Sequence, residues 1–344
     1  MHLVVFIGFL LQTERHTPHQ SPFGDSFPSR GSLWKEHKMY KIFIDGSAGT
    51  TGLRIRERLS ERKDIELLIL PEELRKDTSA RAEMLNKSDV SFLCLPDAAA
   101  VEAVSLIDDP DTVVIDTSTA HRTADGWIYG MPELTGQREL IRASKRIANP
   151  GCHAGGFIAL VRPLVEKGIL SPDIRLSCFS LTGYSGGGKK MIAEYEDEGR
   201  SALLDAPRIY ALPQAHKHLP EMKKLSLLEF EPVFSPIVAS YYSGMEVSVG
   251  VTRDVISGGI EDIKAVYKEY YNSGLIRYDD STEGGFISAS AFSGRDDMCV
   301  AVYGNDERIT LISRFDNLGK GASGAAIQNM NICLGIDEAT GLIV

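Results

Sequence analysis

The sequence predicts an α/β protein in which a doubly wound parallel sheet is followed by an α+β region with a mostly antiparallel sheet. Three observations support this prediction. Short apolar segments alternate with helical patterns over about residues 40–117. The first apolar segment runs into a glycine-rich loop. After residue 152 the strand-like segments lengthen, and fewer helical patterns separate them.

The first part of the chain has the pattern of a sheet that is buried on both faces. We expect strands at 40–45, 65–70, 90–95 and 112–117, with helices near 51–61, 78–87 and 97–107. Short, continuously apolar strands between helices are typical of a parallel sheet that helices cover on both sides.

A glycine loop follows the first predicted strand. Its residues are Gly46, Ser47, Ala48, Gly49, Thr50, Thr51 and Gly52, so the glycines are spaced G-x-x-G-x-x-G. Glycines at the end of a first strand permit a tight turn and let the backbone approach a pyrophosphate at the helix N-terminus. We therefore predict a Rossmann-like fold that binds a dinucleotide through these seven residues. An ordinary strand-to-helix turn is the alternative.

A second motif, Asn149-Pro150-Gly151-Cys152-His153, lies between the apolar piece 146–148 and an apolar helical run at 154–161. Pro and Gly favour a turn, which places Cys152 at a helix N-terminus. Unpaired backbone N–H groups and the helix dipole favour a thiolate there, and a thiolate is the nucleophile that attacks an acyl carbon. The alternative is that Cys152 is a small buried apolar residue.

The second part of the chain has longer strand-like segments. We expect strands at 174–182, 233–241, 244–252 and 299–304, and helices near 189–198 and 260–273. Small residues at helical spacing in 316–331 predict a tightly packed helix that returns to the first domain. The expected domains are 39–152 for dinucleotide binding, 153–311 for catalysis and dimerisation, and 312–344 for the returning helix.

Residues 1–38 do not continue either pattern. An apolar run at 4–11 resembles the core of a signal peptide, but only His2 precedes it and no small-residue cleavage site follows. The polar stretch 12–37 contains three prolines, and its composition is typical of disorder. We expect residues 1–38 to be a disordered or non-native extension and Met39 to be the natural start. A targeting segment is the alternative.

Two histidines, His216 and His218, lie two residues apart in Leu212–Glu221. Such a pair can bind a metal, but no third ligand cluster accompanies it, and we predict no metal site. Alternatively, one histidine acts as a general acid or base for the thiol, because its pKa lies near neutrality. A purely structural role is the remaining interpretation, and we favour it for His216.

Two polar loops are further candidates. The glycine-dense loop 181–190 contains Ser185 and Gly186, and its backbone amides suit a phosphate or carboxamide group. Residues 116–122 end the fourth predicted strand, where ligands of open α/β sheets gather. There Arg122 could pair with a carboxylate or phosphate. A flexible hairpin tip and a surface arginine are the respective alternatives.

Charge and cysteine content exclude several classes of partner. The net charge of −10 argues against nucleic-acid binding, which needs a basic face. The apolar run at 4–11 is too short to span a bilayer, so we expect no membrane partner. Five scattered cysteines without a C-x-x-C pair indicate a reducing compartment, with no disulfide framework and no zinc knuckle.

Taken together, five motifs give the chain a family resemblance over 39–344. They are Gly46–Gly52, Tyr129-Gly130-Met131-Pro132-Glu133, Asn149–Cys152, Thr182–Lys189 and His216-Lys217-His218-Leu219-Pro220-Glu221. The chain resembles the N-acetyl-γ-glutamyl-phosphate reductases of arginine biosynthesis, and in particular their shorter bacterial subgroup. Longer relatives carry Ser-Ala-Asp-Phe-Arg where this chain has Ser-Thr-Ala-His-Arg at 118–122.

The resemblance implies an NADPH-binding domain, a catalytic domain and an NADPH-dependent reduction of N-acetyl-γ-glutamyl phosphate to N-acetylglutamate 5-semialdehyde through a cysteine thioester. It implies Cys152 as the nucleophile and a histidine as acid/base, which we place at His218 with His216 in reserve. We assign further cofactor contacts to Ser118, Ser185 and Gly186. Substrate contacts are assigned to Arg122, Asn149 and Glu221.

The resemblance also favours NADP as cofactor, a homodimer or homotetramer, and a cytoplasmic location. The sequence itself leaves the cofactor open, because Glu72 could bind the ribose 2′-hydroxyl of NAD, whereas Arg75 or Lys76 could bind the 2′-phosphate of NADP. Two other functions remain. Aspartate-semialdehyde dehydrogenase shares this thioester chemistry, although the His-Lys-His-Leu-Pro-Glu cluster argues against it. A non-catalytic NADP-binding redox sensor would use Cys152 as its sensing thiol.

Overall fold

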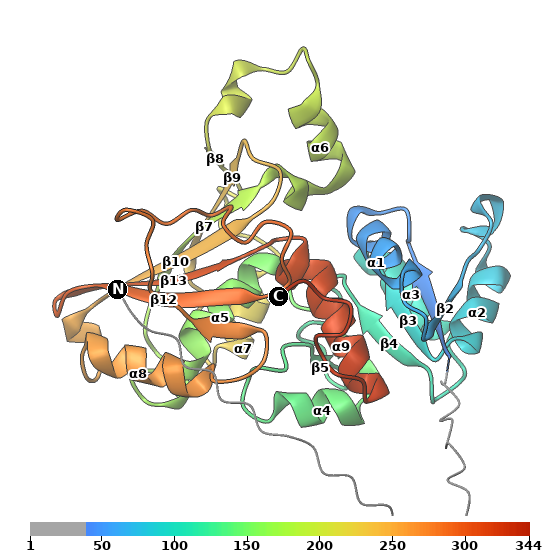
Figure 1. Cartoon of the computed structure of the whole chain (residues 1–344), viewed down its shortest axis with the longest axis horizontal. Helices are drawn as coiled ribbons and strands as arrows, with labels where there is room; N and C mark the ends of the chain where they lie inside the picture. Colours follow the sequence, from blue (N-terminus) through green and yellow to red (C-terminus); the bar gives the residue numbers. More distant parts are fainter. Residues whose placement is uncertain (1–38) are drawn as a thin grey trace, which may run out of the picture. The chain divides into compact units, whose positions relative to one another are not determined.

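The computed structural model describes residues 39–344, which contain two sheets of six and seven strands (Figure 1). The expectations about the extension 1–38 lie outside the described residues. The first sheet has strand order β2-β1-β3-β4-β6-β5, and every neighbouring pair is parallel. This confirms the predicted doubly wound parallel sheet.

The elements of the first sheet lie close to their predicted positions. The strands are β1 (Tyr40–Asp45), β2 (Ile65–Leu68), β3 (Val90–Leu93), β4 (Val113–Asp116), β5 (Ile128–Tyr129) and β6 (Arg146–Ala148). The helices are α1 (Thr50–Ser60), α2 (Thr78–Lys87), α3 (Asp97–Ser105) and α4 (Gln137–Ala143). The structure adds β5 and α4, which are too short to give a clear sequence pattern.

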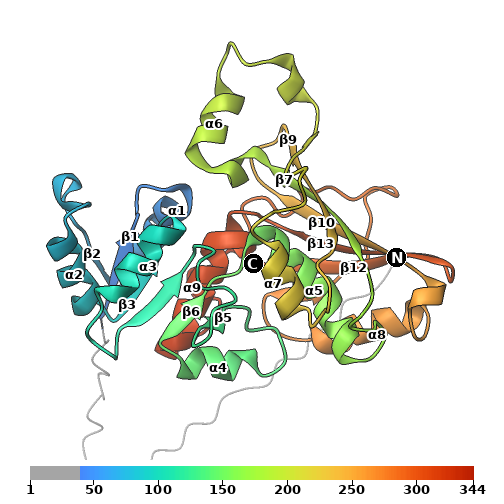
Figure 2. The same ribbon diagram turned by 180° about the vertical axis from the view of Figure 1, so that it is seen from behind.

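Helices cover both faces of this sheet. Ile42 and Ile44 of β1 pack with Ile55 of α1 and Ile327 of α9 (Gly324–Leu334). Phe43, which points to the other face, packs with residues of α2 and α3. Successive strand residues alternate between faces, so one apolar strand supplies two cores. The C-terminal helix α9 therefore lies on the same face as α1 (Figure 2).

Helix α5 (Cys152–Glu166) connects the two sheets and is buried along most of its length. It begins directly after β6 and the Asn149-Pro150-Gly151 turn. Apolar residues surround it on several sides, as expected for a helix that is hydrophobic all round. The fold thus fixes Cys152 at the point where the chain leaves the first sheet.

The second sheet has the order β11-β12-β13-β10-β7-β9-β8 and is mostly antiparallel, as predicted; only β11–β12 and β7–β9 are parallel pairs. Its strands are β7 (Ser177–Gly183), β8 (Arg208–Ile209), β9 (Val233–Ala239), β10 (Met245–Thr252), β11 (Ile276–Tyr278), β12 (Met298–Gly304) and β13 (Arg308–Phe315). The associated helices are α6 (Gly188–Glu196), α7 (Leu219–Leu225) and α8 (Ile260–Tyr270). Helices α5 and α8 contribute to the core on one face of this sheet.

Four elements of this part, β8, α7, β11 and β13, were not predicted, and one predicted helix begins later than expected. Strand β13 pairs with both β10 and β12. Polar and apolar residues alternate over 308–311, as in a half-buried strand, but the alternation is lost over 312–315, where Ser313 and Arg314 are buried too. The expected helix over 316–331 begins only at Gly324, after a π-helical turn at Gly319–Ser323. Such π-helical turns are frequently found at functional sites.

Candidate active site

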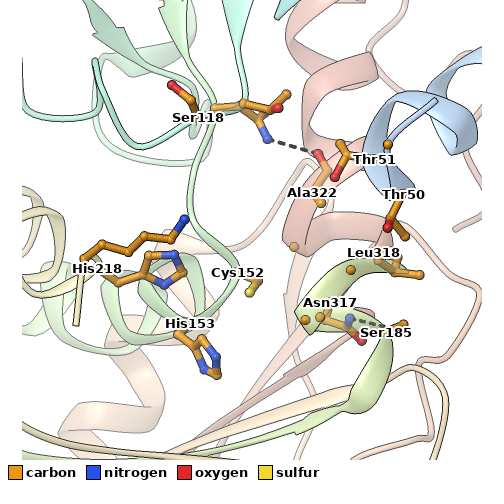
Figure 3. A pocket seen from close by; sticks show the side chains of 18 of the residues that line it. Thr50, Thr51, Ser118, Cys152, His153, Ser185, His218, Asn317, Leu318 and Ala322 are labelled. Carbon is orange, nitrogen blue, oxygen red and sulfur yellow. Dashed lines mark hydrogen bonds between the residues drawn. The ribbon is translucent and has the colours of Figure 1, made fainter. Parts of the chain in front are cut away.

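A cavity of about 610 Å³ collects segments that are far apart in the sequence. Its lining includes the start of α1, the loop after β4, the start of α5, the loop after β7, the His216–His218 segment and the turn before α9. Figure 3 shows Cys152 with His153 and His218 on one side and Thr50, Leu318 and Asn317 on the other. The predicted cofactor and catalytic motifs thus meet in one place.

The glycines of the 46–52 loop let backbone segments of this chain approach one another more closely than any side chain would allow. A Cβ on Gly46, whose φ is +86°, would lie 2.3 Å from the carbonyl oxygen of Cys94. A Cβ on Gly52 would lie 2.6 Å from the oxygen of Gly46. The helix α1 follows Gly49 with no side-chain cap and no acidic residue in its first turn. Its free N–H groups therefore fit a pyrophosphate.

This loop lies between two hollows. Gly49–Gly52 line the large cavity, whereas Gly46, Ser47 and Ala48 line a smaller one of about 110 Å³. Arg56 and Arg75 also line the smaller hollow. Its only acidic lining residue, among residues 39–344, is Asp45, which is paired with Arg81. Of Glu72, Arg75 and Lys76, the three residues considered as contacts of the cofactor ribose, only Arg75 lines this hollow.

Cys152 is the first residue of α5 and lines the large cavity, half-buried. The π-helical turn packs directly against it, since a Cβ on Gly321 would lie 3.0 Å from the Cβ of Cys152. Burial raises the pKa of the Cys152 thiol, while Arg122 and backbone N–H groups act to lower it. We expected the helix N-terminus to favour a thiolate, but burial outweighs it, and the resting form near neutral pH is the thiol.

His218 lies beside the turn that precedes Cys152. A Cβ on Gly151 would come within 2.6 Å of the Nε2 atom of His218. Burial, with a further contribution from Arg122, lowers the pKa of His218 well below its usual value. The imidazole of His218 is therefore neutral near pH 7, with a ring nitrogen available to accept a proton, although the lowered pKa makes it a weaker base than a free imidazole. Its Nδ1 atom is buried and has no hydrogen-bond partner within residues 39–344.

His216 lines the same cavity but is more exposed than His218. Burial lowers its pKa to about 4, and its Nδ1 accepts a hydrogen bond of 3.1 Å from the backbone N–H of His218. His216 thus supports the backbone of His218 from the side. This contact agrees with the structural role that the sequence favours.

His153 was not among the site residues predicted from the sequence. His153 is buried at the cavity, and its ring nitrogens contact Ser180 Oγ at 2.7 Å and the Tyr210 hydroxyl at 2.8 Å. Burial lowers its pKa to about 3, so it is neutral. Its position directly after Cys152 could have marked His153 as a site residue. Its partners Ser180 and Tyr210 could not be predicted, because they are distant in the sequence.

Glu221 and Arg122 form a buried ion pair behind the cavity. The Glu221 Oε1 atom accepts a 2.7 Å hydrogen bond from Arg122. Its Oε2 atom accepts hydrogen bonds from the Tyr129 hydroxyl at 2.9 Å and the Gly151 N–H at 3.1 Å. Glu221 does not line the cavity, whereas Arg122 does. The pair ties the nucleophile turn to β5, and the predicted substrate contact of Glu221 stays a prediction.

The remaining predicted residues line the cavity but also make internal contacts. Asn149 donates to the carbonyl of Ala322 at 3.0 Å, and Ser185 Oγ accepts a 3.0 Å hydrogen bond from Asn317. Ser118 donates to Asp116 at 2.7 Å. Gly186 lines the cavity beside Ser185. Asn317 and Gly321 were missed by the sequence analysis, because only small-residue spacing marked their segment.

Residues 39–344 contain neither a membrane-spanning helix nor a cluster of metal ligands. No helix in this range is long and apolar enough to cross a membrane. No group of three or more His, Cys, Asp or Glu side chains in this range is arranged to hold a metal ion.

Comparison with known proteins identifies the family. Residues 41–143 match the semialdehyde dehydrogenase NAD binding domain, and residues 152–317 match the semialdehyde dehydrogenase dimerisation domain. N-acetyl-gamma-glutamyl-phosphate reductase 2 of Nostoc sp. is 45% identical over 318 residues, which cover 88% of this chain and 99% of that protein. The chain belongs to the N-acetyl-γ-glutamyl-phosphate reductase family. The reductase of Brucella suis is 44% identical over 86% of this chain and 99% of its own length.

Solved structures with a similar fold are more distant in sequence. Aspartate semialdehyde dehydrogenase II of Vibrio cholerae superposes with a TM-score of 0.66 at 16% identity, covering 86% of this chain and 98% of that one. The aspartate semialdehyde dehydrogenase of Candida albicans, solved with NADP, has a TM-score of 0.61 at 17% identity, covering 86% and 98%. These likenesses confirm the fold.

Proposed function

We propose that this chain reduces N-acetyl-γ-glutamyl phosphate to N-acetylglutamate 5-semialdehyde, with NADPH as reductant and Cys152 as covalent nucleophile. The observation that carries the proposal is the shared cavity: Cys152, a neutral His218 and the glycine loop all border one space. Family membership supplies the substrate, since the relatives of 44–45% identity are named for it.

The chemistry begins with a proton transfer, because the resting Cys152 is a thiol. Neutral His218 accepts the Sγ proton as sulfur attacks the acyl carbon. The bond between that carbon and the phosphate oxygen breaks, phosphate leaves, and a thioester remains on Cys152. Dividing the reduction in this way replaces one difficult step by two easier ones.

When bound, NADPH supplies the hydride that reduces the thioester carbon. The proton held on His218 returns to Sγ as the carbon–sulfur bond breaks and the aldehyde is released. Glu221 holds the Gly151 N–H and Arg122, which keeps the turn before Cys152 in place. Gly49–Gly52 hold the pyrophosphate at the start of α1, and the arginines of the smaller hollow favour NADP over NAD.

The decisive experiment runs the reaction in reverse. Purified protein is given NADP⁺ and inorganic phosphate with N-acetylglutamate 5-semialdehyde or, separately, with aspartate semialdehyde, and NADPH formation is followed. We expect phosphate-dependent turnover with the acetylated substrate alone. Turnover only with aspartate semialdehyde would retain the thioester chemistry but replace the substrate. Tight NADPH binding without any turnover would favour the redox sensor.

We further propose that the protein acts in the cytoplasm as a homodimer or homotetramer. The match of residues 152–317 to a dimerisation domain supports self-association. The cysteines at 94, 152, 178, 299 and 333 are all free, which suits a reducing compartment. Light scattering on the eluting protein distinguishes a mass of two chains from one of four.

A further inference from the structure

One cation at the large cavity, Lys217, is not used by the protein itself. The charged side chains that line the cavity, among residues 39–344, are Asp97, Arg122 and Lys217. His153, His216 and His218 also line it, and their lowered pKa values leave them neutral near pH 7. The two formal cations therefore decide how the cavity can hold an anion.

Arg122 is already committed to protein acceptors. Its Nε donates to the carbonyl of Asn149 at 3.0 Å, and its other two nitrogens donate to Glu221 at 2.7 Å and to the carbonyl of Thr117 at 3.1 Å. Only 8% of its side chain is exposed, and the Glu221 carboxylate balances its charge. Two of the five guanidinium N–H groups remain for a ligand, but the neighbouring Glu221 carboxylate offsets the attraction of Arg122 for an anion.

Asp97 is likewise committed, but to Thr119. Its two carboxylate oxygens accept hydrogen bonds from the Thr119 N–H at 2.9 Å and from the Thr119 hydroxyl at 2.5 Å. Lys217 is close enough to contribute to lowering the pKa of Asp97, yet it forms no ion pair with it. Asp97 therefore attracts Lys217 at a distance but does not hold its ammonium group through a hydrogen bond or ion pair.

Lys217 makes no hydrogen bond or ion pair with any other residue of 39–344, and its side chain is exposed. It lies between His216 and His218, so its ammonium group is carried by the segment that places the acid/base histidine. A flexible lysine with three free donors suits an oxyanion arriving from solvent.

We propose that Lys217 binds an oxyanion of the substrate, either the phosphoryl group or the α-carboxylate. This inference rests on the proposed function, because it takes its ligand from the proposed substrate. Both groups are anionic, and neutral histidines alone would leave their charge uncompensated in the cavity. Lys217 thus carries a charge at the cavity that no ion pair of residues 39–344 balances, whereas the charge of Arg122 is balanced by Glu221.

The reverse reaction separates the two anions, because phosphate and N-acetylglutamate 5-semialdehyde are then added as different substrates. Lys217→Met should raise one of the two KM values by roughly 10- to 100-fold, since a hydrogen bond to a charged group is lost. A higher KM for phosphate assigns Lys217 to the phosphoryl group, and a higher KM for the semialdehyde assigns it to the carboxylate. Lys217→Arg should retain most of the affinity.

The matched control is Lys223→Met. Lys223 is another exposed lysine nearby on α7, but it does not line the cavity. If Lys217→Met leaves both KM values within the range of this control, or raises the KM of NADP⁺ alone, the inference is wrong. Absence of turnover in the unaltered protein would instead refute the proposed function, so the two failures are distinguishable.

Discussion

Two helix N-termini open into the same cavity, and they prepare it in different ways. Helix α1 starts after Gly49, on a loop where an added Cβ at Gly52 would lie 2.6 Å from a backbone oxygen. Helix α5 starts at Cys152, where the N–H of Gly151 is taken by Glu221. The start of α1 depends on glycines that lack a Cβ, whereas the start of α5 is held by the buried Arg122–Glu221 ion pair.

The comparison shows that a helix N-terminus does not determine chemistry alone. At α1 the N–H groups remain available for an anion, because no side chain caps them. At α5 the same dipole acts on Cys152, but burial outweighs it and raises the pKa of the thiol. The reactivity of Cys152 therefore depends on a neighbouring base. The cofactor loop instead depends on glycines that let its backbone segments approach closely.

The largest expected effect is at the nucleophile. Cys152→Ser should lower turnover by at least about four orders of magnitude, because serine would not form the thioester at a useful rate. Steady-state assays give the rate, and mass spectrometry of protein mixed with acyl phosphate shows whether an adduct forms. Substantial aldehyde production by this variant would refute the covalent route.

The next effect concerns the base that the buried thiol requires. His218→Asn should lower kcat by about two to four orders of magnitude, as for loss of a general acid/base. His216→Asn is the matched comparison and should cost far less. Because the pKa of His218 lies well below its usual value, protonation of His218 should not reduce activity of the unaltered protein between pH 8 and pH 6. Equal losses of kcat in the two variants would contradict the assignment of His218, rather than His216, as the acid/base residue.

The sequence predicted the regions whose signal is local. The glycine spacing of Gly46–Gly52 and the continuous apolar strands around it lie within a few residues of each other. The parallel first sheet followed from that pattern, and the Pro150-Gly151 turn gave the position of Cys152 at a helix start. Strand β13, which pairs on both sides, was missed because the alternation of polar and apolar residues is lost over 312–315.

What the sequence could not supply is the environment that long-range contacts create. The Glu221–Arg122 pair joins residues 99 positions apart, and His153 reaches Tyr210 across 57 positions. Burial of Cys152 and His218, which reverses the expected state of the thiol, arises from segments that meet only in the folded chain. Spacing within a motif carries none of this information.

A smaller effect tests the close backbone contact between Gly52 at the start of α1 and Gly46. Gly52→Ala places a methyl group 2.6 Å from the oxygen of Gly46, so the loop must shift. We expect the KM for NADPH to rise by roughly 10- to 100-fold, since displacements of about 1 Å cost up to about that factor. Gly250→Ala is the control, because a Cβ there meets no atom within 4 Å. An unchanged KM in both variants would mean that the loop tolerates side chains.

The smallest effect concerns cofactor choice at the hollow beside the glycine loop. Arg75→Met removes a cation that lines this hollow and makes only a 3.5 Å contact with Glu72. If Arg75 meets the 2′-phosphate, the KM for NADPH should rise about tenfold, because an exposed charged contact is screened by water, while the KM for NADH stays unchanged. Lys76→Met is the matched control, since Lys76 does not line the hollow. A parallel change for both cofactors would show that Arg75 supports the loop rather than the phosphate. Arg75 would then hold the backbone of the cofactor loop in place, as Glu221 and Arg122 hold the turn before Cys152.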